Sequence, residues 1–154
     1  MAFVVYDKKL VLYDEEKLET ATPIKEIKIT TDNDFNYTDS SQKGYGKAKI
    51  TNGFLTGNYT SQSGLTNLLT QTIETTISSQ NEADRFAKGL LRQSNKNLTK
   101  GVFKLPLMRE FSAGSVMKIN TTGANTWNGN GFVSHIRQDY VNSTSKVFFR
   151  KAVV

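Results

Sequence analysis

The sequence predicts a mainly β protein of the α+β kind, a small antiparallel β-barrel or sandwich with one amphipathic helix, at about 80–93, packed against it. Two observations lead to this prediction. Apolar and polar residues alternate with a period of two in several short segments separated by turn residues, which is typical of half-buried strands. Only one segment has its apolar residues at clear helical spacing. The chain has 154 residues and neither a repeat nor a linker, so we expect a single domain over 1–154.

The first 30 residues contain three strand candidates. Phe3–Tyr6 and Leu10–Tyr13 are apolar runs separated by three charged residues, and they predict a hairpin. Asp14–Thr22 is charged and predicts a helical turn or a loop. Ile24–Thr30 alternates strictly, so we expect a half-buried strand there.

The next segments combine turns and strands. Asp32–Ser41 is rich in turn residues, whereas Tyr45–Thr51 alternates and predicts a strand. Asn52-Gly53 is a strong turn signal and predicts a two-residue hairpin loop. Gly64–Ser79 is ambiguous between helix and strand, but the many Thr and Ile residues of its second half favour a strand.

The predicted helix has a start signal and one apolar stripe. Ser79 and Glu82 have the spacing of a capping box, in which each side chain accepts a hydrogen bond from a free backbone amide. The apolar stripe then follows helical spacing, and we expect it to pack against a sheet; it consists of Ala83, Phe86, Ala87, Leu90 and Leu91.

After the helix the chain returns to strands. Gly101–Leu105, which Pro106 ends, and Ser115–Asn120 are the first two candidates. Thr121–Gly131 is a loop rich in Gly and Asn. Phe132–Tyr140 and Lys146–Val153 predict a final hairpin.

Composition excludes most classes of catalytic site. There is no cysteine, so disulfides, thiolate zinc sites and cysteine nucleophiles are excluded. The single histidine, His135, excludes a multi-histidine metal site. Along a strand it would lie about 13 Å from Asp139, too far for a hydrogen bond. Asp32–Asn36 begins like a calcium loop but lacks the later glycine and glutamate, so we expect only a turn. We predict a protein that is not an enzyme and holds no cofactor or metal.

The charge is distributed unevenly. Residues 1–42 hold nine acids and five bases, a net charge of −4, and residues 43–154 hold five acids and fifteen bases, a net charge of +10. Seven bases and no acid occur from Arg85 to Arg109. Such a segment is typical of a solvated face, of a surface for an acidic protein partner, or of a nucleic-acid-binding surface. Four aromatic residues near lysines are candidates for base stacking or for core positions: Tyr45, Phe54, Tyr59 and Phe103.

Residues 79–149 carry an ordered pattern of packing and turn residues: a helix that opens on acid-alanine, a strand, a proline, a glycine that opens a strand, and a final hairpin. The segments that form this pattern are Glu82–Leu91, Gly101–Pro106, Ala113–Ile119, Gly131–Ile136 and Val147–Phe149. In this pattern the chain resembles the hub, or gpD-like, proteins of contractile phage tails and related injection systems, whose relatives include tail-tube proteins. The family places a histidine where this chain has Gln138. The resemblance implies a small β-barrel that forms rings, and it implies no catalysis.

Together these observations predict a structural assembly protein of a phage tail, baseplate hub or related contractile injection machine that oligomerises into a ring or tube. Its partners would be further copies of itself and neighbouring tail or baseplate proteins. A ring contact would bring the acidic first quarter to the basic remainder, with Arg85, Lys88, Arg92 and Lys96 as candidate interface residues. The alternatives are a nucleic-acid-binding β-barrel module and a ligand-binding or adhesin-like β domain.

The expected location follows from the same features. No stretch is long and apolar enough for a secretory signal or a membrane span. We therefore expect assembly in the bacterial cytoplasm and a final place in a virion or injection particle, without contact with a membrane.

Overall fold

The computed structural model describes residues 2–6, 8–122 and 127–151, which form two compact units. We call Met1–Asp39 with Thr99–Val154 the sheet unit, and Ser40–Leu98 the helix unit. The predicted mainly β class, with one main helix packed on a sheet, is confirmed. The prediction of a single domain stays a prediction.

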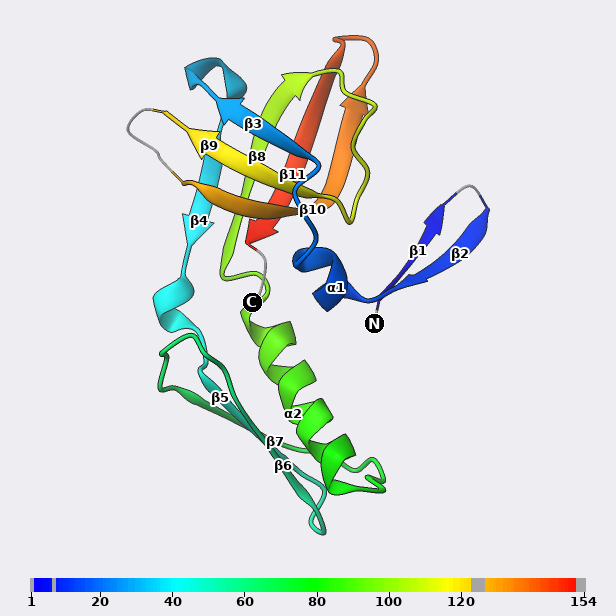
Figure 1. Cartoon of the computed structure of the whole chain (residues 1–154), viewed down its shortest axis with the longest axis vertical. Helices are drawn as coiled ribbons and strands as arrows, with labels where there is room; N and C mark the ends of the chain where they lie inside the picture. Colours follow the sequence, from blue (N-terminus) through cyan, green and yellow to red (C-terminus); the bar gives the residue numbers. More distant parts are fainter. Residues whose placement is uncertain (1, 7, 123–126, 152–154) are drawn as a thin grey trace. The chain divides into compact units, whose positions relative to one another are not determined.

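Six strands of the sheet unit form one curled sheet, a half-barrel in the order β3-β9-β10-β11-β8-β4 (Figure 1). All neighbours are antiparallel except β3 and β9, which are parallel. The six strands are β3 (Lys25–Ile29), β4 (Asn36–Asp39), β8 (Thr99–Pro106), β9 (Val116–Thr121), β10 (Gly129–Asp139) and β11 (Thr144–Lys151).

The inner face of this sheet carries the main core. Alternation along each strand turns every second side chain inward, and β3 follows the predicted pattern, with Ile27 and Ile29 buried and Glu26 and Lys28 exposed. The cluster is completed by Phe103, Leu105, Phe111, Met117, Ile119, Val133, Val147 and Phe149. Burial of these large apolar side chains supplies most of the free energy that stabilises the unit.

Strand β10 contains a β-bulge at Ser134. Val133 pairs with Phe149, but the next paired residue of β10 is His135, opposite Phe148. The Ser134 hydroxyl donates a hydrogen bond to the Phe148 carbonyl (3.1 Å). The extra residue shifts the alternation by one position, so that Val133 and Ile136 both contact the inner core.

The short helix α1 (Glu15–Glu19) covers part of the outer face. Arg150, which pairs with Phe132 across β10 and β11, is almost fully buried there. Its Nη2 lies 2.5 Å from a Glu19 carboxylate oxygen and 3.2 Å from one of Glu15. The guanidinium also lies 4.4 Å from the centre of the Phe132 ring. A buried cation is thus neutralised by two carboxylates one helical turn apart.

The predicted N-terminal hairpin is present. Strands β1 (Ala2–Tyr6) and β2 (Lys9–Tyr13) pair antiparallel and form a sheet of two strands. The charged segment that follows contains α1, which begins after Asp14, whose carboxylate accepts a hydrogen bond from the Glu16 amide. Both features agree with the sequence.

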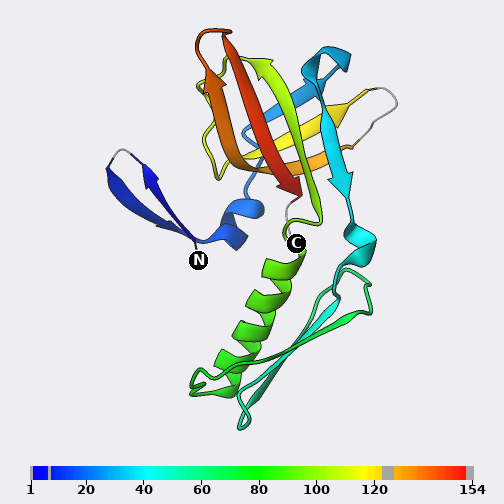
Figure 2. The same ribbon diagram turned by 180° about the vertical axis from the view of Figure 1, so that it is seen from behind.

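The helix unit consists of a three-stranded sheet and the main helix (Figure 2). Its strands are β5 (Lys47–Thr51), β6 (Thr56–Thr60) and β7 (Leu68–Thr72), in the order β6-β5-β7. Helix α2 (Gln80–Asn95) packs on β5 and β6. The core between them consists of Ala48, Ile50, Ala87 and Leu91, so most of the predicted apolar stripe does face a sheet. Phe86, which the prediction included, is 40% exposed. Strand β7 runs parallel to β5. It lies mostly in the first half of the ambiguous segment Gly64–Ser79, so the prediction of a strand in the second half was wrong.

Helix α2 covers the edge strand β6 at very short range. The Asn58 amide donates a hydrogen bond to the Asp84 carboxylate (2.9 Å), so a helix side chain satisfies a backbone donor of β6. Gly57 lies against the helix backbone, where a Cβ atom would lie 2.0 Å from the Ala83 carbonyl oxygen. The glycine is therefore required by the close approach of helix and strand.

Three further local predictions need correction. The loop between β5 and β6 has four residues, because the Asn52 side chain accepts hydrogen bonds from the Phe54 and Leu55 amides and holds a longer turn.

The second correction concerns the cap of α2, where Ser79 accepts a hydrogen bond from the Glu82 amide as predicted. However, the Glu82 carboxylate accepts from the Ser78 amide (2.8 Å) and hydroxyl (2.6 Å) rather than from Ser79. These bonds, above all the one from the Ser78 hydroxyl, lower the pKa of Glu82 below its usual value.

The third correction concerns Asp32–Ser41, where only turns were expected. Two short 3₁₀ helices do flank this segment, η1 (Thr31–Asn33) and η2 (Ser41–Lys43). Between them, strand β4 pairs with β8 at the edge of the main sheet. All four of its residues are exposed, so it has no alternation of burial that the sequence pattern reveals.

A matched pair of glycine substitutions tests the packing of helix and strand in the helix unit. Gly57→Ala places a Cβ against helix backbone and should lower the free energy of unfolding by about 2 kcal/mol. Gly89→Ala, in α2, meets no atom within 4 Å and should raise it by about 0.5–1 kcal/mol, because alanine has less unfolded-state entropy to lose. Urea denaturation measures both. Equal effects of the two variants would contradict the close approach.

A second matched pair tests the buried cation of the sheet unit. Glu19→Gln removes a carboxylate from Arg150 where the two side chains are 2% and 5% exposed, and should cost about 3 kcal/mol. Glu26→Gln makes the same chemical change in a pair with Lys118 that is 44% and 51% exposed, and should cost less than about 1 kcal/mol. Thermal and urea unfolding measure the difference. A mild effect at Glu19 would show that α1 does not depend on this ion pair.

Candidate functional site

The four predicted interface residues lie along α2 and its C-terminal end. Arg85, Lys88 and Arg92 belong to α2, and Lys96 is its C-cap residue. Arg85 is exposed and lines a hollow of about 250 Å³ with Glu82 and Phe86. The Lys88 ammonium lies 5.9 Å from the centre of the Tyr59 ring. Spacings of three and four residues put these bases on one side of the helix. Their role in an interface stays a prediction.

His135 and Asp139 have separate surroundings, as their spacing predicted. The His135 ring is stacked on Phe148, with 3.9 Å between ring centres and 13° between the planes. The Asp139 carboxylate accepts hydrogen bonds from the Asn142 side chain (2.7 Å) and from the Asn142 and Val141 amides. These bonds, above all the one from the Asn142 side chain, lower the pKa of Asp139. Its charge stabilises the turn between β10 and β11.

The segment Asp32–Asn36 contains the end of η1, a left-handed turn at Asp34 and the first residue of β4. Asn33 accepts a hydrogen bond from the Thr30 amide (2.8 Å), and Asp34 has a left-handed backbone with φ of 46°. Over residues 2–6, 8–122 and 127–151, no three His, Cys, Asp or Glu side chains are grouped as metal ligands. Within the same ranges, no helix is long and apolar enough to cross a membrane.

The four aromatic residues considered for base stacking have three different environments. Phe103 is fully buried in the main core. Tyr45 and Tyr59 are half-buried against the core of the helix unit. Phe54 is 96% exposed, but it lies in the loop between β5 and β6. The structure therefore does not bring these four rings together on one face of a sheet.

The β1–β2 hairpin has an apolar face. Leu10 and Leu12 share one side of β2 and are 65% and 63% exposed. The hairpin pairs with no further strand in the described part of the chain. A hairpin of two strands is only marginally stable alone in water. These exposed leucines are therefore a candidate contact surface.

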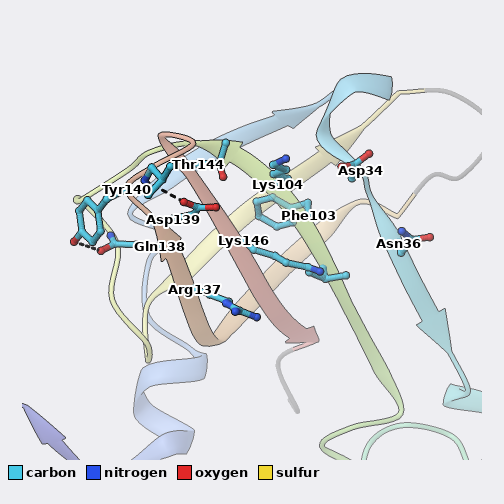
Figure 3. A pocket seen from close by; sticks show the side chains of 12 residues that line it. Asp34, Asn36, Phe103, Lys104, Arg137, Gln138, Asp139, Tyr140, Thr144 and Lys146 are labelled. Carbon is cyan, nitrogen blue, oxygen red and sulfur yellow. Dashed lines mark hydrogen bonds between the residues drawn. The ribbon is translucent and has the colours of Figure 1, made fainter.

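A row of three cations crosses the outer face of the main sheet. Arg137 on β10 pairs with Lys146 on β11, which in turn pairs with Lys104 on β8. All three are exposed, and we call them the cation row. They line a hollow of about 600 Å³ in the sheet unit, together with Asp34 and Asp139 (Figure 3).

An apolar row runs beside the cation row on the same face. His135, Phe148 and Val102 pair in sequence across β10, β11 and β8. The Lys146 ammonium lies 5.7 Å from the centre of the Phe148 ring, a cation–π contact. The outer face thus presents three positive charges next to a partly exposed apolar strip, an arrangement suited to binding an anionic partner.

The sequence alone did not reveal the cation row. A hairpin of β10 and β11 was predicted, which brings Arg137 and Lys146 to the same pair of strands. The bulge at Ser134 determines on which face of the sheet Arg137 lies. The pairing between β8 and β11 determines that Lys104 lies next to Lys146. Neither feature has a signal in the local pattern of residues.

Comparisons with known proteins identify the fold. No protein-family model and no curated protein matches the sequence. Among solved structures, the tail protein from Neisseria meningitidis MC58 matches 85% of this chain with a TM-score of 0.60 and 8% identity. The 43 kDa tail protein of prophage MuSo2 from Shewanella oneidensis matches 82% of the chain with a TM-score of 0.63 and 9% identity.

The chain spans less than half of each of these two proteins, 45% and 42% of their lengths. At such low identity the likeness establishes a common fold and nothing further about chemistry. The resemblance that the sequence suggested is therefore confirmed at the level of a tail-protein fold, and the closer assignment to hub proteins stays a prediction. This chain has the fold of a part of two tail proteins, one of which comes from a prophage.

Proposed function

We propose that this protein is a structural component of a phage tail or of a related contractile injection machine, and that it acts by self-association. The observation that carries the proposal is the fold shared with two tail proteins over 85% and 82% of the chain. Its place would then be in the assembled particle, in the baseplate hub or the tube, after assembly in the bacterial cytoplasm.

The exposed apolar hairpin supports self-association. Burial of one leucine side chain stabilises a contact by about 1.5–3 kcal/mol, and Leu10 and Leu12 are both available on one face of β2. A protein surface that leaves such residues in water is commonly an interaction site. In a ring of identical subunits, the hairpin of one copy would bind a different surface of the next copy.

The ends of the main sheet offer further contacts. Among the described residues, β3 and β4 each pair with a single neighbouring strand, so each has a backbone edge on which another strand can pair. A ring that joins such edges would extend the half-barrel from copy to copy. The bases of α2, among them Arg85 and Lys88, would contribute charge complementarity to an acidic neighbour.

The double variant Leu10→Lys/Leu12→Lys tests the hairpin as an assembly contact. We expect the wild-type chain to form an oligomer of defined mass, and the variant to dissociate at least about tenfold more readily, because each buried leucine contributes more than 1.4 kcal/mol. Size-exclusion chromatography with light scattering measures both masses over a range of concentrations.

A matched control uses Phe54→Lys/Val141→Lys. These residues are 96% and 93% exposed and lie in the loops of two other hairpins, so the control adds the same charge and removes apolar area away from β2. It should leave the oligomer intact. A wild-type monomer at high concentration would contradict self-association, and equal dissociation of both variants would contradict the role of the hairpin.

A further inference from the structure

In the described part of the chain, the cation row forms no ion pair, although the charge of Lys104 helps to lower the pKa of Asp139. Lys104, Lys146 and Arg137 are direct neighbours on three adjacent strands. The ion pairs of the described residues involve other cations, and no described carboxylate lies within salt-bridge distance of these three. Side chains directly opposite each other on paired strands have Cβ atoms about 4.5–5.5 Å apart, and like charges at that distance destabilise a sheet.

The two acidic residues at the rim of the hollow offset this repulsion only in part, since Asp139 interacts with Lys104 over a distance longer than an ion pair. Asp139 is bound by the turn that follows it, through the Val141 and Asn142 amides and the Asn142 side chain. Asp34 lines the hollow from the segment after η1. Three exposed cations therefore face two carboxylates, one of which already stabilises a turn. A local loss of stability of this kind is a cost that function commonly imposes.

The same face of the sheet shows which partner chemistry it accepts. Four residues further along β11, Arg150 is neutralised by Glu15 and Glu19 of α1, two carboxylates one helical turn apart. On a helix, residues three or four apart have Cβ atoms about 5–6 Å apart, which matches the spacing of side chains across neighbouring strands. An acidic helix laid across the strands thus has its carboxylates at the spacing of the cations.

We propose that the cation row, with the apolar row beside it, binds an acidic helical segment of a partner protein. The carboxylates of the segment would lie over Arg137, Lys146 and Lys104, and its apolar residues would contact Phe148 and Val102. The aromatic pair His135–Phe148 is stacked on itself, which leaves little ring face for bases and favours a peptide over a nucleic acid. This inference does not depend on self-association through the hairpin.

The binding test uses a synthetic alanine-rich helical peptide with Glu at every fourth position, its Gln counterpart, and an oligothymidine of equal formal charge. Fluorescence anisotropy at low salt measures the dissociation constants for the full chain. We expect the Glu peptide to bind at least about tenfold more tightly than the Gln peptide, and salt to weaken the complex.

Two triple variants with the same change in net charge separate a local site from a general charge effect. Lys104→Gln/Arg137→Gln/Lys146→Gln should weaken binding of the Glu peptide at least about tenfold. Lys28→Gln/Lys47→Gln/Lys49→Gln removes three exposed lysines outside the cation row and should leave the dissociation constant within about twofold. Equal losses in both variants would overturn the proposal.

The unfolding temperature gives a second readout that distinguishes a binding role from a structural one. Because repulsion within the row opposes the contacts of Lys146 with Phe148 and of Lys104 with Asp139, the first triple variant should unfold at nearly the same temperature as the wild type. An unfolding temperature lowered well beyond that of the second triple variant would show that the cations chiefly stabilise the fold and would overturn the proposal. Oligothymidine that binds more tightly than the Glu peptide, and is released by the same variant, would overturn it in favour of a nucleic-acid surface.

Discussion

The β-bulge at Ser134 is the constraint on which much of the sheet unit depends. One extra residue in β10 moves every later side chain of the strand to the opposite face. Before the bulge, Phe132 points outward and pairs with Arg150, which α1 covers. After it, Ile136 points inward and joins the core. A regular β10 could place Phe132 outward beside Arg150 or Ile136 inward in the core, but not both.

The same bulge decides which residues meet solvent. It turns His135 and Arg137 outward, so that Arg137 lies beside Lys146 and Lys104. Without the shift, the register set by Val133 and Phe149 would place Ile136 opposite Lys146, and the row would lose a cation. Packing and surface chemistry therefore have one origin in this strand. The exposed hairpin is a separate feature, since β1 and β2 pair only with each other in the described residues.

Local structure could be predicted where buried positions recur at regular spacing, because the sequence then shows a periodic pattern of apolar residues. Ile27 and Ile29 marked β3, and Ala83, Ala87 and Leu91 marked the buried side of α2. β4 was missed because its four residues are exposed and its place depends on pairing with β8. The prediction of a two-residue loop at Asn52-Gly53 was wrong, because the Asn52 side chain organises a longer turn. The candidate interface residues of α2 came from charge alone, whereas the cation row requires a register between strands far apart in the sequence.

The proposed self-association requires identical chains of this tail-protein fold to form a closed assembly. Native mass spectrometry of the unmodified protein tests this requirement, because it counts the subunits in each complex over a range of concentrations. A closed ring should give one dominant complex with a fixed number of 17.2 kDa chains. A single chain at every concentration, or a continuous ladder of sizes without a preferred copy number, would contradict it.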